Sequence, residues 1–144
     1  ELTSALAFSR TLLLSAGLSY VRGVKEAKPG VGISDRDIAE IPPLKSRVTF
    51  RYGGKRFFAE PELVLARKQV RVDSDLRELG TPGYAVLTLK GGLHLGGLYL
   101  VAGIENLLDR QYYEHLCYQR DPFRSGVKVP EPGRNLYLNV SYTF

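Results

Sequence analysis

The chain is poor in residues that mark several common protein classes. Its 144 residues include one cysteine, two histidines, and neither methionine nor tryptophan. A single thiol cannot form an internal disulfide, so the sequence has no disulfide framework. No stretch approaches about 18 consecutive apolar residues, which excludes a transmembrane helix. Because no methionine is present, we expect Glu1 to be a boundary within a longer protein.

Sequence signals of catalysis and of nucleic-acid binding are also missing. The chain contains no G-x-S-x-G, paired-histidine or Walker motif, so we predict neither an enzyme nor a bound cofactor. The net charge is +5, but the lysines and arginines are spread along the whole chain. Nucleic-acid binding favours basic residues clustered on one face, so no nucleic-acid partner is expected.

Apolar and polar residues alternate with a period of two along most of the chain. A period of two is typical of strands with two different faces. One face is rich in leucine, alanine and aromatics, and the other carries lysine, arginine, glutamate, serine and threonine. About seven strands are predicted, at residues 2–8, 12–22, 44–52, 57–68, 84–95, 98–106 and 134–144.

The connections between these strands alternate in length. Short turns are expected at 9–11, 53–56 and 95–97, and glycine in the last two would permit positive φ. Long polar connections are expected at 24–43, 73–83 and 107–133. Because alternate turns of a meander share one end of the sheet, all long loops should lie at one end and all tight turns at the other.

Two all-β architectures fit this pattern. A soluble sandwich buries one apolar face, whereas a bacterial outer-membrane barrel has short periplasmic turns and long extracellular loops. Predicted strands of roughly ten to twelve residues favour the membrane barrel. Proline cannot donate to a β-ladder, so Pro61 is expected at an edge or a bulge. Single-chain barrels close with an even strand number, so we expect further strands before Glu1.

Three stretches, TPGYAVLTLKGGL (81–93), VAGIENLLDRQYYEHL (101–116) and VPEPGRNLYLNVSYTF (129–144), resemble the C-terminal end of TonB-dependent outer-membrane receptors. In that family the penultimate strand runs into an N-L-x-D-x-x-Y pattern, and a Pro-Gly-Arg introduces a final strand that ends on Phe. Here these elements are Asn106, Asp109 and Tyr112, and then Pro132, Gly133 and Arg134 before Phe144.

The resemblance implies an all-β, antiparallel up-and-down meander that forms the C-terminal segment of a 22-stranded transmembrane β-barrel. Residues 1–144 would be that segment, without the plug domain and the N-terminal strands. The family imports iron-siderophores, cobalamin, copper or similar nutrients across the bacterial outer membrane. Implied partners are membrane lipid, the rest of the barrel and its plug, the TonB complex through a missing N-terminal part, and the barrel assembly machinery. The alternative is a self-contained small β-barrel or β-sandwich that acts as a binding or structural module.

The stretch 111–126 is the most prominent candidate for a ligand site. Aromatic rings and arginines suit a bulky anionic chelate, because guanidinium groups match carboxylates and stack on rings. His115 and Cys117 are ligand types for soft metals, which would suit copper. The alternative is an ordered loop that packs its own aromatics. The candidate ligand-binding residues are Tyr112, Tyr113, His115, Tyr118, Arg120 and Arg124.

Other polar and aromatic residues receive structural interpretations. Asn106 and Asp109 could bind a ligand, but their side chains are better suited to capping a turn where the strand leaves the membrane, because Asn and Asp bond their own backbone nearby. The family resemblance makes Phe144 an assembly signal, and an aromatic girdle shared with Tyr142 is the alternative. The charges expected on the inner wall should pair with one another; they are Lys45, Arg47, Arg51, Glu60, Glu62, Lys68, Lys90, His94 and Glu105.

Overall fold

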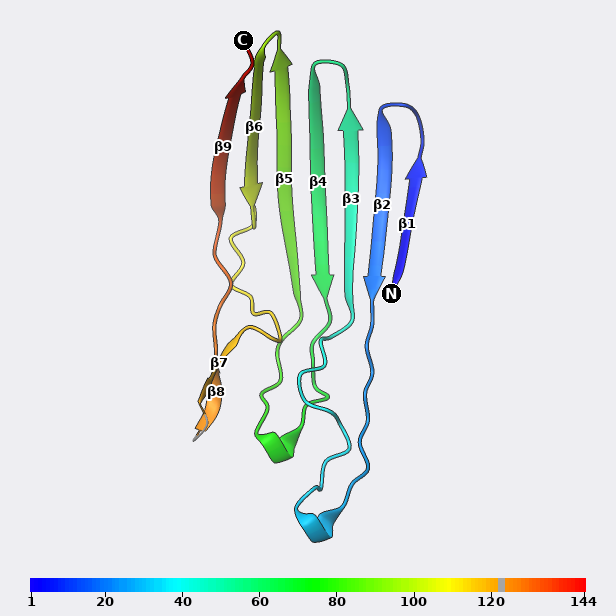
Figure 1. Ribbon diagram of the computed structural model, residues 1–144, viewed down its shortest axis with the longest axis vertical. Helices are drawn as coiled ribbons and strands as arrows, with labels where there is room; N and C mark the ends of the chain where they lie inside the picture. Colours follow the sequence, from blue (N-terminus) through cyan, green and yellow to red (C-terminus); the bar gives the residue numbers. More distant parts are fainter. Residues whose placement is uncertain (122–123) are drawn as a thin grey trace.

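The computed structural model describes residues 1–121 and 124–144, with the side chains of 118–126 left out of the description. Seven strands form one antiparallel sheet in the order β1-β2-β3-β4-β5-β6-β9 (Figure 1). The predicted all-β meander of about seven strands is confirmed. The strands are β1 (Leu2–Ala7), β2 (Leu12–Ser19), β3 (Lys45–Gly53), β4 (Phe57–Ala66), β5 (Tyr84–Leu95), β6 (Leu98–Glu105) and β9 (Asn135–Tyr142).

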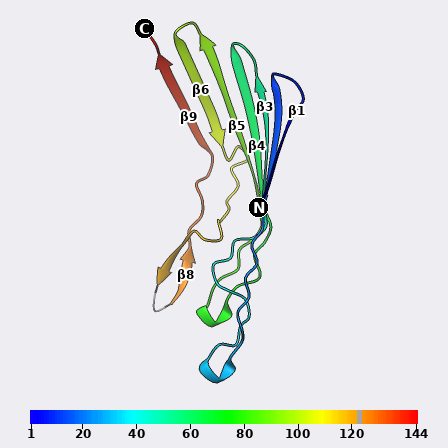
Figure 2. The same cartoon turned by 45° about the vertical axis from the view of Figure 1, so that its right-hand side comes forward.

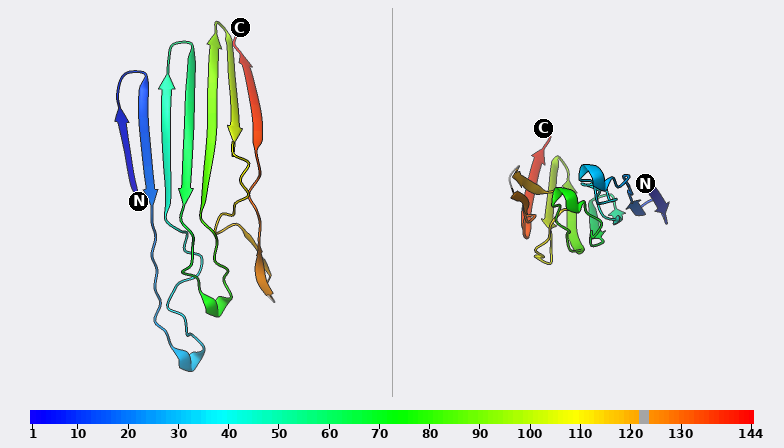
Figure 3. Two further views of the ribbon diagram at one scale, coloured as in Figure 1. Left: turned by 180° about the vertical axis from the view of Figure 1, so that it is seen from behind. Right: turned by 90° about the horizontal axis from the view of Figure 1, so that it is seen from below.

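The sheet is a single layer, and no other element covers either of its faces (Figures 1 and 3). Apolar side chains of β9 remain largely exposed: Leu136 by 69%, Leu138 by 67% and Val140 by 61%. Among the described residues, Ala66 and Val86 are the buried apolar side chains. Strands β1 and β9 each have one neighbour in the sheet. The chain therefore forms neither a closed barrel nor a sandwich, which contradicts the self-contained alternative.

Several strands are shorter than predicted, because prolines limit their partners. Strand β2 was expected to reach residue 22 but ends at Ser19, which pairs with the first residue of β3, Lys45. Pro42 and Pro43 lie just before β3 and have no N–H to continue the ladder. Strand β4 ends at Ala66, which pairs with both Lys45 and Tyr84. The seven strands of this sheet have 6 to 12 residues.

All tight turns lie at one end of the sheet and all long loops at the other, as predicted (Figures 1 and 2). Gly96 has a φ of 62°, which confirms the glycine role predicted for the turn after β5. The corresponding prediction for the 53–56 turn is wrong, because neither Gly53 nor Gly54 has positive φ. The long loops contain the short helices η1 (Pro29–Val31) and η2 (Ser74–Leu76). Within the described ranges, no helix is both long and apolar enough to cross a membrane.

A second, two-stranded sheet was not predicted. Strands β7 (Tyr118–Asp121) and β8 (Arg124–Lys128) pair within the connection that we expected to be a loop. Figure 2 shows this hairpin beyond the loop end of the main sheet, apart from η1 and η2. Its two strands have four and five residues, which gives too few alternating positions to predict a strand from the sequence.

Charges on the polar face of the sheet pair across neighbouring strands. Glu62 lies 3.2 Å from the Arg47 guanidinium, and Thr49 donates to the same carboxylate at 3.3 Å. Glu60 pairs with Arg51 and lies 3.7 Å from the Lys90 ammonium. The predicted pairing of inner-wall charges is confirmed for these residues. The pairs are partly exposed to solvent, so each contributes only about 0–1 kcal/mol to stability.

Pro61 lies in a central strand, which contradicts its expected place at an edge or a bulge. It pairs with Leu89 of β5. On the other side, the register between β3 and β4 stops at Thr49↔Glu62 and resumes at Tyr52↔Ala59. The missing N–H of proline accounts for an interrupted ladder at this point.

Two glycines of the polar face lie beneath aromatic rings of their cross-strand partners. Gly92 pairs with Phe58, and Gly103 pairs with Tyr137. A Cβ atom on Gly92 would overlap the Phe58 ring and lie 2.9 Å from the Leu100 carbonyl oxygen. A Cβ atom on Gly103 would overlap the Tyr137 ring. Both glycines therefore make room for cross-strand aromatic packing.

Gly92→Ala is expected to lower the free energy of unfolding of the intact protein by about 2 kcal/mol, because the added methyl overpacks a ring and a backbone carbonyl. Gly17→Ala in β2 is the matched control, since no atom lies within 4 Å of the added Cβ. The control should be neutral or slightly stabilising. Urea midpoints measured in lipid bilayers would compare them. Equal midpoints for the two variants would contradict this packing role.

Candidate functional site

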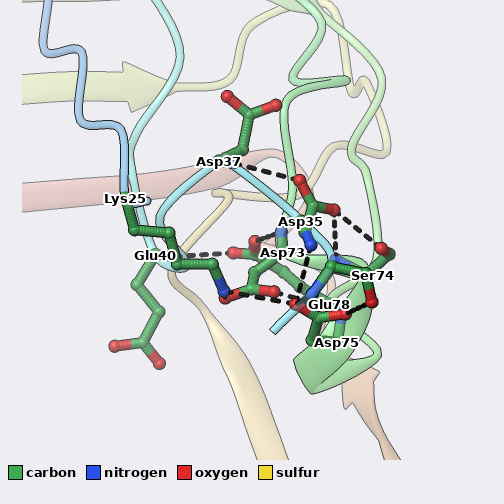
Figure 4. A network of polar contacts seen from close by, with 9 residues as sticks. Lys25, Asp35, Asp37, Glu40, Asp73, Ser74, Asp75 and Glu78 are labelled. Atoms are coloured by element: carbon green, nitrogen blue, oxygen red, sulfur yellow. Dashed lines mark hydrogen bonds and ion pairs between the residues drawn. The ribbon is translucent and has the colours of Figure 1, made fainter. Parts of the chain in front are cut away.

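Hydrogen bonds join the three long loops, which comprise residues 20–44, 67–83 and 106–134. The first two loops bind each other reciprocally (Figure 4). Asp75 accepts hydrogen bonds from the backbone N–H groups of Ser34 at 3.0 Å and Asp35 at 2.8 Å. In return, Asp35 accepts from the backbone N–H of Ser74 at 2.9 Å and from its hydroxyl at 2.7 Å. Each loop therefore binds the backbone of the other through a carboxylate.

A lysine and two further carboxylates extend this network. The Lys25 ammonium pairs with Asp73 and lies 3.6 Å from Asp75 (Figure 4). Glu78 accepts from the backbone N–H groups of Glu40 and Asp73, both at 2.8 Å. The acidic side chains of the network are therefore used to fix loop backbones. Among the described residues, no three His, Cys, Asp or Glu side chains are arranged to hold a metal ion.

The contacts shift the pKa values of Asp35, Asp75 and Lys25 toward their charged forms. The hydrogen bond from the Ser74 hydroxyl holds the pKa of Asp35 well below its usual range. The backbone N–H of Asp35 similarly lowers the pKa of Asp75. The hydrogen bond to Asp73 raises the pKa of Lys25. Asp35, Asp75 and Lys25 are therefore ionised at neutral pH.

His115 attaches the third loop to the second. Its side chain is nearly inaccessible, with the residue 2% exposed, and its Nε2 atom lies 3.1 Å from Glu78 Oε1. Because a carboxylate only accepts, Nε2 carries the proton, and Nδ1 accepts from the Thr81 hydroxyl at 3.0 Å. Burial, followed by the charge of Lys128, lowers the pKa of His115 against the opposing effect of Glu78. The neutral imidazole is therefore the form that fits.

A cavity of about 380 Å³ lies on the polar face where the sheet meets the loops. Glu114 of the third loop accepts hydrogen bonds there from Lys45 and from the Tyr84 hydroxyl, both at 2.5 Å. The rings of Tyr84 and Tyr112 pack at a centroid distance of 4.6 Å. Burial opposes ionisation of Glu114, but the two hydrogen bonds prevail and lower its pKa. The cavity is lined by two cations, Lys45 and Arg47, and by four carboxylates, Glu62, Glu105, Glu114 and Glu131.

The residues of the two sequence motifs meet at the exit of β6. The Asn106 side chain accepts from the Arg110 N–H at 2.9 Å and donates to the carbonyls of Arg110 at 2.8 Å and Pro132 at 3.2 Å. Asp109 accepts from the Arg134 N–H at 2.8 Å. A Cβ on Gly133 would lie 2.9 Å from the Asp109 carboxylate. The contacts made by Asn106 and Asp109 are those of turn-capping residues.

The candidate ligand-binding residues do not form one group in the described structure. Tyr112 lines the cavity, His115 is buried in the loop contact, and the Tyr113 hydroxyl accepts from Gln111 at 3.4 Å. The side chains of Tyr118, Arg120 and Arg124 lie outside the described residues.

The two candidate metal ligands, His115 and Cys117, also lie in different surroundings. Both ring nitrogens of His115 have hydrogen-bond partners, whereas Cys117 is exposed. A hydrogen bond to Glu131 raises the pKa of Cys117, which disfavours the thiolate that metals bind. Glu114 and Glu131 line the cavity, but the sequence did not predict this role, because strand periodicity does not extend into loops.

Tyr142 and Phe144 lie together at the tight-turn end. Their rings make an edge-to-face contact with a centroid distance of 5.2 Å. Tyr142 is 60% exposed and Phe144 is fully exposed. This exposure is consistent with the predicted aromatic girdle.

Comparison with solved structures finds extensive similarity to transport proteins. The chain is similar to the copper transporter OprC, with 25% sequence identity and a TM-score of 0.80 over 99% of this chain and 23% of that chain. It has the fold of part of the ferric enterobactin receptor PfeA from Pseudomonas aeruginosa. Two mutant forms of that receptor, in complex with enterobactin, each match at 20% identity and a TM-score of 0.65 over 99% of this chain and 22% of theirs.

The chain thus spans less than a quarter of the length of these structures. No protein-family model and no curated protein matches it. The predicted resemblance to a barrel segment of TonB-dependent receptors is confirmed.

Proposed function

We propose that residues 1–144 form the C-terminal part of the β-barrel of a TonB-dependent outer-membrane receptor, and that the complete receptor imports a metal chelate. The remainder of the barrel, a plug domain and the TonB complex would be its partners, and the barrel assembly machinery would insert it. In this role the chain supplies part of a transport wall and a ligand-facing cavity, and it catalyses no reaction.

The similarity to the copper transporter over 99% of the chain carries this proposal. Two features of the molecule support it. The apolar face is exposed along whole strands, as a lipid-facing wall requires. The long loops are fastened into one assembly at the end opposite the tight turns, where an outer-membrane receptor meets its ligand.

The charge of the cavity narrows the proposed cargo. Lys45 and Arg47 are paired with Glu114 and Glu62, which leaves Glu105 and Glu131 in excess. A negative lining repels anionic chelates and favours a metal cation or a chelate without net negative charge. We therefore propose copper, free or weakly chelated, in preference to the bulky anionic chelate expected from the sequence.

Uptake measurements on cells that express the intact receptor would test this function. Copper should accumulate faster with the receptor than without it, and only when TonB is present. A receptor-dependent accumulation of an anionic ferric siderophore, with copper unaffected, would contradict the cargo. No TonB-dependent accumulation of copper, a ferric siderophore or cobalamin would contradict the receptor itself.

Glu131→Gln is expected to lower copper uptake several-fold at low copper concentration, because it removes one of the excess negative charges of the cavity. Glu26→Gln is the matched control, since Glu26 is exposed in the first loop and lies 3.2 Å from the Lys28 ammonium. The same decrease in both variants would indicate a general effect of charge and would count against the cavity.

A further inference from the structure

The tight turns of the sheet carry basic side chains and no acidic ones. Arg10 lies in the turn between β1 and β2, and Lys55 and Arg56 lie in the turn between β3 and β4. All three are exposed. The turns at residues 8–11, 54–56 and 96–97 contain no Asp or Glu. We call Arg10, Lys55 and Arg56 the basic rim.

The basic rim is not neutralised within the described part of the chain. None of its three side chains forms an ion pair with a described residue. By contrast, Arg47, Arg51 and Lys90 on the polar face all pair with Glu60 or Glu62. The rim charges are therefore available to an anionic partner outside the chain.

Aromatic side chains place the rim at a membrane surface. Phe8 is 59% exposed and Phe57 is 49% exposed, and the Tyr52 ring packs against Phe57 with a centroid distance of 4.8 Å. The pairings Leu12↔Tyr52, Phe57↔Leu93 and Leu98↔Tyr142 place Tyr52, Phe57 and Tyr142 on the apolar face, near the tight turns. Aromatic girdles lie at the level of lipid headgroups. Arg56 precedes Phe57 by one position, and Arg10 follows Phe8 by two positions. Both cations therefore lie within about 7 Å of the headgroup level.

The apolar face below the girdle offers space for acyl chains. A shallow depression of about 700 Å³ lies across β4, β5, β6 and β9. Its floor is the row Ala59, Gly91 and Ala102, which are paired across the strands. Phe57 pairs with Leu93, which lines the depression, and it directly follows Arg56 of the basic rim. A lipid whose phosphate contacts the rim can therefore extend its chains over this surface.

We propose that the basic rim binds the phosphate headgroups of anionic phospholipids in the inner leaflet of the outer membrane. Two turns separated by two strand spacings hold the cations about 10 Å apart, which suits headgroups of neighbouring lipids. Basic residues near an anionic membrane surface each strengthen binding by about five-fold. The inference rests on the proposed function for its orientation, with the tight turns on the periplasmic side.

The experiment compares lipid retention by the intact receptor in nanodiscs that contain equal amounts of phosphatidylglycerol and phosphatidylcholine. Lipids that remain bound are counted by native mass spectrometry. The wild-type protein should retain phosphatidylglycerol with about ten-fold or greater preference. The variant Arg10→Gln/Lys55→Gln/Arg56→Gln should retain the two lipids within about two-fold of each other.

The control variant Arg36→Gln/Arg67→Gln/Lys68→Gln removes three exposed cations from the loop end and should keep the preference. Unchanged preference in the rim variant, or equal loss in the control, would overturn the proposal. If the triple rim variant does not fold, Lys55→Gln alone should lower the preference by about five-fold, and no change would overturn it.

Two further results separate this inference from the proposed function. In nanodiscs to which lipid A is added, a rim variant that loses retention of lipid A while retaining phosphatidylglycerol would place the rim in the outer leaflet and overturn the inference. Fractionation of cells tests the receptor independently. A wild-type protein absent from the outer membrane would reject the proposed function, whereas an outer-membrane protein with an insensitive rim would reject the lipid site alone.

Discussion

Asn106→Ala should lower the free energy of unfolding of the intact protein by about 3 kcal/mol, since it removes three part-buried hydrogen bonds to backbone groups. Asn106 is 3% exposed and bonds the N–H and carbonyl of Arg110 and the carbonyl of Pro132. Its φ of 48° adds to the expected loss, because alanine is disfavoured in the left-handed region that asparagine tolerates.

Two variants would separate these causes. Asn106→Gly restores the backbone freedom but not the hydrogen bonds, so its stability should lie between those of the wild type and the alanine variant. Asn135→Ala is the matched control, because the exposed Asn135 amide makes a single hydrogen bond to Glu105 at 3.3 Å. Urea unfolding in bilayers provides the measurement. An alanine variant as stable as the Asn135 control would show that the turn does not depend on this side chain.

The sheet could be predicted from the sequence because its information is local. Strand β5 was predicted at residues 84–95 and is observed as Tyr84–Leu95, since its alternation is regular and a neighbouring strand pairs along its length. Errors occurred where a strand depends on its partner. The residues after Ser19 keep alternating, but β2 ends because Pro42 and Pro43 prevent β3 from beginning earlier.

The loop assembly could not be predicted in the same way. Lys25 and Asp73 are separated by 48 residues, Ser34 and Asp75 by 41, and His115 and Glu78 by 37. No periodicity links such positions, and the acidic residues of the second loop are as compatible with a solvated turn as with a network. The family resemblance identified the motif residues Asn106, Asp109, Pro132, Gly133 and Arg134, but the hydrogen bonds that join Asn106 to Pro132 and Asp109 to Arg134 were not predicted.

Acidification should loosen the contact between the second and third loops through His115. Its pKa in the folded protein is below the ordinary histidine value of 6.5, so the unfolded chain binds more protons in the interval between the two values. Stability from the neutral imidazole is therefore fully present above pH 6.5 and is lost as pH falls from 6.5 through the folded pKa. The groups that face His115 set this shift. Lys128 disfavours the imidazolium and Glu78 favours it, with burial as the largest cause.

His115→Gln should make the protection of residues 67–83 and 106–117 independent of pH between 7.5 and 5.5, whereas the wild type should lose protection at the acidic end. Hydrogen exchange of the intact receptor measures this protection.

His115→Ala should already weaken this protection at pH 7.5 by about 1–3 kcal/mol, because Thr81 loses its buried partner and Glu78 keeps only its backbone donors. The other histidine, His94, is the control: it lies on the polar face beside the tight turn between β5 and β6, with its ring in edge contact with Tyr99 at a centroid distance of 6.1 Å. If His94→Gln abolished the pH dependence and His115→Gln did not, His115 would not be the group that makes the loop contact sensitive to pH.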